Sequence, residues 1–195
     1  MDQCIIPECY IDTKLIKMIV PPKGRYNHQH GTNAFSIMQP DDKVKKRKAG
    51  ILHDTFALAI VDEDFEEREY PRECNLIYQL PGKLKLKKHP LKHHYFIMIC
   101  PEFEKWLIGQ VKEMGSTLEE YGLPSDLDQL ERITKTSKSE NQDPYSDNFK
   151  RLFKDLREYN TTSIALIRLW ITYLKENPYN ADLVHLVAET DKLCQ

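Results

Sequence analysis

The chain has 195 residues, of which 41% are hydrophobic, and a formal net charge of -2. This length is sufficient for one domain with a hydrophobic core. No apolar run approaches the roughly 20 residues that a membrane-spanning helix needs, and no basic region precedes an apolar one at the N-terminus. The sequence therefore predicts a cytoplasmic protein that has no membrane partner. Because the 5 cysteines include no C-x-x-C pair, a disulfide framework or a cysteine-ligated zinc site is not expected.

The first predicted elements are a short strand and a helix. Cys4–Ile6 is an apolar run that Pro7 ends, because proline is not expected inside a central strand. In the stretch that follows, apolar residues recur at helical spacing at positions 15, 16, 19 and 20, and Asp12 is a suitable N-cap. Further along, Phe56–Val61 is an uninterrupted apolar run with β-branched residues. Its length favours an inner strand of a parallel sheet.

Two more strands and a helix are predicted in the middle of the chain. In residues 75–88 apolar and polar residues alternate on both sides of Pro81-Gly82, which is the signature of a β-hairpin. The second stretch alternates leucine with lysine, so we expect one of its faces to be exposed to solvent. His93–Cys100 is another buried strand, and a helix then begins near Pro101 and ends near Gly115. From Ser116 onwards only amphipathic helices are predicted. We therefore expect an α/β core over residues 1–115 and a helical segment over 116–195, packed on or beside it.

Acidic residues follow three of the predicted strands. Glu8 follows the first, Asp62 and Asp64 follow the second, and Glu104 follows the third together with Glu102. In α/β sheets ligands bind at the carboxyl ends of the strands, and residues i and i+2 of an extended chain project to one side. Asp62 and Asp64 are therefore candidate ligands of one Mg²⁺. The alternatives are a solvated turn for the two aspartates and a favourable helix dipole for the two glutamates.

These acidic motifs resemble those of Toprim domains. "CIIPECYID" is similar to the strand, glutamate, second acid and helix that open the family's domain, with Glu8 and Asp12 in the acidic places and Cys9 where glycine is common. "AIVDEDFE" resembles the family's Asp-x-Asp motif, and "CPEFEKWLI" resembles an element of small Toprim-like proteins of the OLD-nuclease and anti-phage, mobile-element type, with Glu104 in the place of its acid.

The resemblance implies a Toprim-like Rossmannoid fold, with a parallel-type sheet, flanking helices and a β-hairpin insertion. It implies that Glu8, Asp62 and Asp64 are catalytic and, with Glu104, hold Mg or Mn for phosphodiester chemistry on DNA or RNA. A partner ATPase or another protein subunit is a further expectation. The alternative function is that of a catalytically inactive Toprim-fold protein that binds or regulates another subunit. A third alternative is a receiver-like phosphoacceptor module, but such modules place paired acids after the first strand, where this chain has only Glu8.

Basic residues occur in clusters along the sequence, although the numbers of basic (28) and acidic (30) residues are nearly equal. Such clusters either contact phosphate groups or face solvent. A rival hypothesis is a zinc site formed by the histidines of residues 28–30 and 89–94, since imidazole binds zinc. The residues that we predict to contact nucleic acid are Lys23, Arg25, His28, His30, Lys45, Lys46, Arg47 and Lys48.

Overall fold

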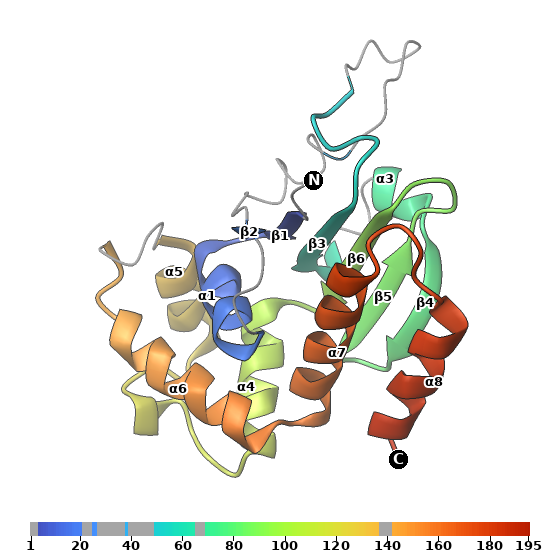
Figure 1. The fold of residues 1–195 in the computed structure, drawn as a ribbon. Helices are drawn as coiled ribbons and strands as arrows, with labels where there is room; N and C mark the ends of the chain where they lie inside the picture. Colours follow the sequence, from blue (N-terminus) through green and yellow to red (C-terminus); the bar gives the residue numbers. More distant parts are fainter. Residues whose placement is uncertain (1–3, 21–24, 27–37, 39–48, 65–68, 137–141) are drawn as a thin grey trace.

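A computed structural model describes residues 4–20, 25–26, 38, 49–64, 69–136 and 142–195. Its strands are β1 (Cys4–Pro7), β2 (Arg25–Tyr26), β3 (Ala57–Asp62), β4 (Asn75–Leu80), β5 (Leu84–Lys88) and β6 (His94–Ile99). Its helices are α1 (Tyr10–Ile19), α3 (Glu69–Arg72), α4 (Phe103–Glu113), the 3-10 helix η2 (Glu119–Tyr121), α5 (Leu127–Thr136), α6 (Ser146–Tyr159), α7 (Thr162–Glu176) and α8 (Leu183–Leu193). Figure 1 shows their arrangement.

The strands form one six-stranded mixed sheet in the order β2-β1-β3-β6-β5-β4. The four strands β2, β1, β3 and β6 are mutually parallel, and β5 and β4 continue the sheet as an antiparallel hairpin. The α/β class, the inner parallel strand at Phe56–Val61 and the hairpin over 75–88 are therefore confirmed. After β1 the chain passes through α1 to β2, which pairs with one edge of β1. Strand β3 pairs with the opposite edge of β1, so the order in which strands are added to the sheet reverses between β1 and β3.

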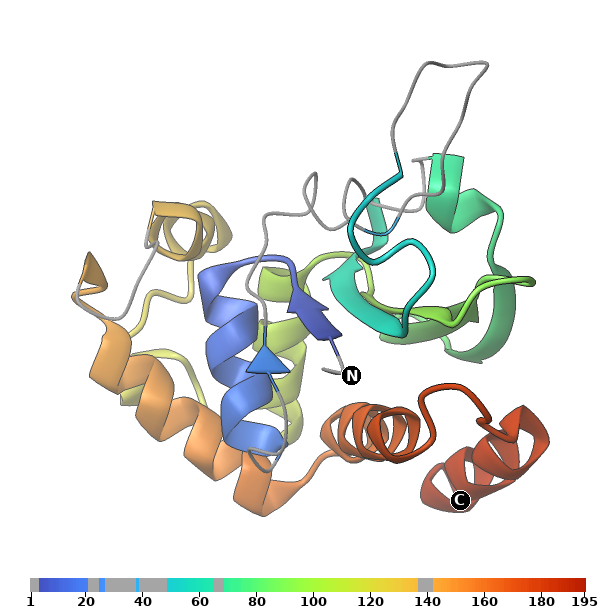
Figure 2. The ribbon, with the colours of Figure 1, turned by 45° about the horizontal axis from the view of Figure 1, so that its top comes forward.

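The two faces of the sheet are covered very differently. Side chains such as Leu58, Ile60 and Ile97 enter a large core cluster that also contains residues of α1 and of α4 to α8. The opposite face carries a smaller cluster, in which Ala57, Ala59 and Phe96 meet Tyr70 of α3 and other buried residues. Figures 1 and 2 show α7 and α8 lying along the first of these faces. Alternate side chains of a strand point to the same face of the sheet. Asp62 therefore points to the same face as Leu58 and Ile60, which is the face covered by the helices of the larger cluster.

The C-terminal helices belong to the same hydrophobic core as the sheet. Phe153 of α6 and Trp170 of α7 are fully buried in the cluster that also holds the sheet residue Ile5. A polar contact adds to this packing, since Lys14 Nζ in α1 donates to the Ser146 carbonyl oxygen at the start of α6, at 2.6 Å. The segment 116–195 is all-helical in its described residues, and it packs directly on the α/β part.

Two local predictions were wrong. Helix α1 begins at Tyr10 with Cys9 as its N-cap, and Asp12 is its third residue, because the Cys9 thiol accepts from the Asp12 amide and the Asp12 carboxylate accepts from the Cys9 amide in a capping box. The lysine side of β5 is not wet, since Lys87 is only 5% exposed. The reason is that β5 is an inner strand whose second face is covered, with Lys87 close enough to influence the buried Cys74 thiol.

His94 connects the residues before β3 and helix α3 to the sheet, on the face that carries the smaller hydrophobic cluster. Its Nε2 donates to the Leu52 carbonyl oxygen at 2.9 Å, and its Nδ1 accepts from the Tyr70 hydroxyl, an assignment that fits a neutral ring. Burial lowers the pKa of His94 to about 4. The contribution of His94 to stability is therefore predicted to decrease as the pH falls from about 6.5, the ordinary histidine value, towards 4, because only the unfolded state takes up this proton.

This prediction is checked by a proton NMR titration of the histidine ring signals. The His94 signal is expected to keep its neutral chemical shift down to about pH 5. A His94 midpoint near 6.5 would contradict the neutral, two-bond arrangement.

Candidate functional site

Glu8 and Asp62 meet at the carboxyl ends of the neighbouring strands β1 and β3. The Glu8 amide continues the β1–β3 pairing by donating to the Ile60 carbonyl oxygen at 2.9 Å, which fixes the backbone at Glu8. The Glu8 side chain then turns towards β3, where its Oε2 accepts from the Asp62 amide at 3.0 Å. This position is the point where the strand connection reverses, the usual ligand-binding crevice of α/β sheets.

Asp62 also connects this edge of the sheet to helix α4. Its Oδ1 accepts from the amide of Phe103, the first residue of α4, at 2.9 Å. Glu102, the N-cap residue of α4, forms no side-chain capping bond of its own, so Asp62 caps the helix from a distance. The helix N-terminus in turn supplies partial positive charge beside the Asp62 carboxylate.

Asp12 is buried next to these residues with one oxygen unsatisfied. It is 5% exposed, its Oδ2 accepts from the Cys9 amide at 3.0 Å, and its Oδ1 is a buried atom without a hydrogen-bond partner in the described part of the chain. Native proteins leave few buried polar atoms in this state, and those that remain are associated with strain, with a functional role or with a bound water or ion.

Glu104, in the first turn of α4, is tied to the C-terminal segment. It is 5% exposed, and its Oε1 accepts from the hydroxyl of Thr134 in α5. Thr134 was missed by the sequence analysis. It lies on an amphipathic helix 30 positions away, and no local pattern associates it with an acid of another helix.

Charge and burial together favour protonation at this site. Burial, followed by the negative charges of Asp12, Glu8 and Glu104, raises the pKa of Asp62 to about 9. Burial and then the charge of Glu8 raise the pKa of Asp12 to about 7, with a smaller contribution from Glu104. The acidic cluster, by which we mean Glu8, Asp12, Asp62 and Glu104, is thus close enough for its members to oppose one another's ionisation.

Asp64 does not join this cluster in the structure. Strand β3 ends at Asp62, and the chain turns at residues 63–64, so the strand alternation that was expected to place Asp64 beside Asp62 does not extend that far. The Asp64 side chain is exposed, and its charge is not among those that raise the pKa of Asp62. The extended backbone on which the pairing of Asp62 with Asp64 was predicted therefore ends at Asp62.

The predicted nucleic-acid contacts cannot be located in the structure. Strand β2 runs parallel to β1, so it points to the sheet edge where Glu8 lies, but for Arg25 only the backbone is described. The remaining predicted contacts lie outside the described residues, and they are Lys23, His28, His30, Lys45, Lys46, Arg47 and Lys48.

The described histidines of the zinc hypothesis have structural partners. His89 Nδ1 accepts from the amides of Leu91 and Lys92, each at 3.1 Å, and both ring nitrogens of His94 are engaged. His28 and His30 lie outside the described residues. In the parts of the chain that the structure describes, no three or more histidine, cysteine, aspartate or glutamate side chains are grouped so that they could hold a metal ion.

Every member of the acidic cluster already accepts a hydrogen bond from the protein. Each member directs one oxygen to a donor of the protein, since Glu8 contacts the Asp62 amide, Asp62 the Phe103 amide, Asp12 the Cys9 amide and Glu104 the Thr134 hydroxyl. All of the candidate cation ligands are oxygens, the type that Mg²⁺ and Mn²⁺ prefer.

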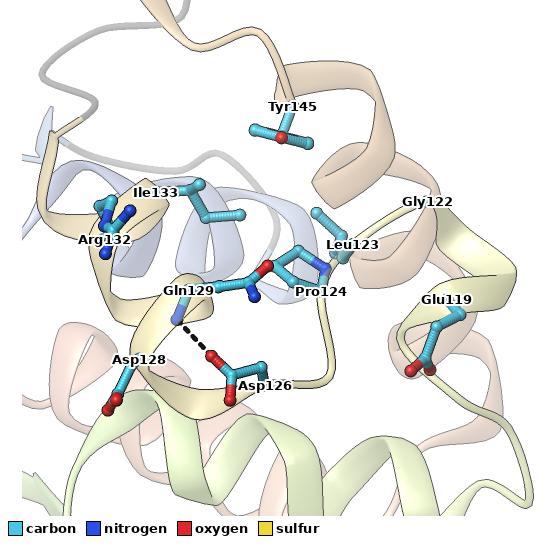
Figure 3. Close-up of a pocket in the computed structure, with 10 residues that line it drawn as sticks. All are labelled: Glu119, Gly122, Leu123, Pro124, Asp126, Asp128, Gln129, Arg132, Ile133 and Tyr145. Atoms are coloured by element: carbon cyan, nitrogen blue, oxygen red, sulfur yellow. Dashed lines mark hydrogen bonds between the residues drawn. The ribbon is translucent and has the colours of Figure 1, made fainter.

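A hollow of about 800 Å³ lies elsewhere, between the η2–α5 connection and the start of α6 (Figure 3). Its lining includes Leu123 and Ile133. Two of its acidic lining residues have structural roles, since Asp126 caps α5 through the Gln129 amide at 3.0 Å and Glu119 accepts from the Ser125 hydroxyl. It contains none of the predicted site residues, although α5 contributes to both this hollow and the contact with Glu104.

Comparison with known protein families, with curated proteins and with solved structures finds no match for this chain. No helix in the described residues is both long enough and apolar enough to cross a membrane.

Proposed function

We propose that the acidic cluster binds Mg²⁺ or Mn²⁺ and that the protein, as a Toprim-like domain with a helical C-terminal segment, carries out phosphodiester chemistry on nucleic acid. The observation that supports this most is the contact between Glu8 and Asp62 at the reversal point of the sheet, with Asp12 and Glu104 close enough to raise the pKa of Asp62 to about 9. Acids required only for folding would not need to be gathered where they destabilise one another.

A divalent cation fits this arrangement chemically. Buried carboxylates that oppose one another's ionisation must either take up protons or bind a positive ion. The donor set consists only of oxygens, and the unsatisfied Asp12 Oδ1 adds a buried oxygen that lacks a partner among the described residues. The cation would therefore compensate a charge that the fold leaves uncompensated.

The roles of the residues follow from their positions. Glu8 and Asp62 would hold the ion, and Glu104 would reach it from the first turn of α4. Asp64, in the exposed turn after β3, would contribute only through rearrangement of that turn. Asp12, whose pKa is about 7, is able to hold or release a proton at neutral pH, as a general acid or base requires. When bound, the ion would supply activated water and stabilise the leaving oxygen.

The second candidate is a catalytically inactive protein that binds or regulates another subunit. It is favoured by the fact that each acid already has a structural partner, and by Cys9, which caps α1 at the place where the resemblance expects a glycine. A side chain there keeps a phosphate further from the backbone than glycine would. The partner ATPase or other subunit belongs to this candidate and to the first alike.

Cleavage assays with single-stranded and duplex DNA and RNA test the proposal. With Mn²⁺ the wild-type protein is expected to cut at least one substrate, and Asp62→Asn is expected to reduce the rate by at least about 100-fold, because the cation loses a ligand. Asparagine keeps an oxygen for the Phe103 amide, so the fold is retained. Exposed Asp128→Asn is the control. Absence of Mn²⁺ binding and of cleavage in the wild type would favour the second candidate.

A further inference from the structure

We propose that the turn between β5 and β6, residues 89–92, is a pH-sensitive switch, in which neutral His89 holds the turn closed through two backbone amides and protonated His89 opens it. The open turn no longer ties the residues before β3 to the sheet. This inference does not depend on the proposed function. The switch lies at the amino ends of β3 and β6, whereas Glu8 and Asp62 meet at the carboxyl end of β3.

The His89 side chain organises this turn through its Nδ1 atom. Nδ1 accepts from the amides of Leu91 and Lys92, each at 3.1 Å, which lie two and three residues further along the chain. An imidazole nitrogen accepts only while it carries no proton. His89 is therefore neutral in the closed turn, with its proton on Nε2, which is 3.5 Å from a carboxylate oxygen of Glu73. His89 is only 6% exposed, so water does not readily replace these contacts.

Protonation of His89 Nδ1 is incompatible with the closed turn because backbone amides can only donate. A proton on Nδ1 would face two amide protons, and both hydrogen bonds would be lost. The neighbouring His94 differs in this respect. Its Nδ1 accepts from the Tyr70 hydroxyl, and a hydroxyl can rotate and accept instead. The turn therefore responds to the protonation state of His89 in particular.

The surroundings of His89 favour its neutral form. Burial lowers the pKa of His89, the charge of Glu73 raises it, and the charges of Lys88 and Lys92 lower it, with a net shift downwards. The closed turn therefore excludes a proton that His89 takes up once the turn is open, and acid favours the open turn. The described titratable groups that face His89 are Tyr70, stacked on its ring at 5.1 Å between centroids, and Glu73 of α3, Lys88 of β5, Lys92 of the turn and His94 of β6, whose ring centroid is 6.5 Å away.

Opening of the turn affects the residues before β3. Lys92 Nζ forms an ion pair with Asp54, which precedes β3. Lys88 Nζ spans the closed turn, since it donates to the carbonyl oxygens of His89 at 2.8 Å and of Lys92 at 3.3 Å. Both contacts depend on where the turn holds Lys92. Leu91 is already 86% exposed, so local opening loses little apolar burial.

The experiment measures hydrogen exchange of the Leu91 and Lys92 amides by NMR on the full chain between pH 7 and pH 5. The rates are expressed as protection factors, which correct for the pH dependence of intrinsic exchange. We expect both protection factors to fall by up to about 10-fold for a decrease of one pH unit below 6.5, because only the open turn takes up the proton. The amide of Ala165, which donates to the Thr161 carbonyl oxygen at the start of α7, is the internal reference.

Substitutions of His89 separate its protonation from its role as an acceptor. An asparagine side-chain oxygen accepts from amides further along the chain as in an Asx turn, but it does not titrate. His89→Asn is therefore expected to keep the turn closed at every pH. His89→Asp should do the same above pH 5, because aspartate ordinarily titrates near 3.9. His89→Ala should leave both amides weakly protected throughout. His185→Gln, at an exposed position of α8, is the control and should behave as the wild type does.

Two results would overturn the inference. One is a wild-type protein in which the protection factors of Leu91 and Lys92 stay constant from pH 7 to pH 5. The other is a His89→Asn variant that retains the wild-type pH dependence, since another group, such as His94, would then be responsible. If His89→Asn does not fold, His89→Asp provides the same comparison.

Discussion

Asp62→Asn is expected to make the cation-free protein more stable at pH 8 and to abolish its stabilisation by Mn²⁺. At pH 8 folding forces the wild-type carboxyl group to take up a proton, because burial and the neighbouring acids raise its pKa to about 9. Asparagine has no such proton to take up, and it keeps an oxygen that can accept from the Phe103 amide. We expect a gain of about 2 kcal/mol in the free energy of unfolding, or roughly 4–8 °C in melting temperature for a chain of this length. Wild-type protein should gain stability from Mn²⁺ by mass action, whereas the variant should not.

The sign of the pH dependence follows from the raised pKa. In the folded protein the pKa of Asp62 is about 9, whereas in the unfolded chain the ordinary value is about 3.9. The folded state therefore holds the proton more tightly, and the contribution of Asp62 to wild-type stability decreases as the pH rises from about 4 to about 9. The advantage of Asp62→Asn should grow over this range and vanish below pH 4. Chemical denaturation at several pH values, in a chelating buffer, measures it.

Asp64→Asn provides the comparison for this experiment, because it removes the same charge two residues away, from an exposed turn. We expect it to change stability by less than about 0.5 kcal/mol at every pH, as exposed substitutions usually do. Equal effects of the two substitutions would mean that the charge of Asp62 is not opposed by its surroundings. A destabilised Asp62→Asn at pH 8 would mean that capping of α4 requires the ionised carboxylate.

The order of the sheet's main elements was predictable because apolar runs are a local signal. The run at Phe56–Val61 is too short for a usual helix and is apolar on both faces, which describes β3 between β1 and β6. The hairpin over 75–88 follows from alternation and a Pro-Gly turn in the same way. The burial of Lys87 was not predictable, because it depends on which elements cover the second face of the sheet.

Only those residues of the site that lie at the ends of strands were predictable from the sequence. Glu8 and Asp62 lie where parallel strands finish, and the sheet rule brings them together without knowledge of any side-chain contact. Asp64 lies two residues past Asp62, where β3 ends, and the exact end of a strand is not encoded by alternation alone. The capping box with Cys9 was hidden because a thiol is an uncommon N-cap, and Thr134 was hidden because its partner is distant in sequence.

Trp170→Ala is expected to be the most destabilising single substitution discussed for this chain, at about 4 kcal/mol, since it leaves a large cavity and a lost hydrogen bond. Trp170 in α7 is fully buried, its Nε1 donates to the Thr190 hydroxyl of α8, and its ring meets that of Tyr78 in β4 at 6.1 Å between centroids. It therefore joins two C-terminal helices to the antiparallel end of the sheet. Trp170→Phe keeps the ring contact and should lose only about 1 kcal/mol.

The same variant tests whether the helical segment and the sheet fold as one unit. The chain has 2 tryptophans, so Trp170→Ala leaves Trp106 of α4 as the single fluorescent reporter of the α/β part. In urea, unfolding followed by Trp106 fluorescence and by far-ultraviolet circular dichroism, to which the C-terminal helices contribute strongly, should give coincident curves because both parts share one core cluster. Separate transitions, with Trp106 unaffected by the loss of Trp170, would mean that the segment after residue 115 is an independent layer.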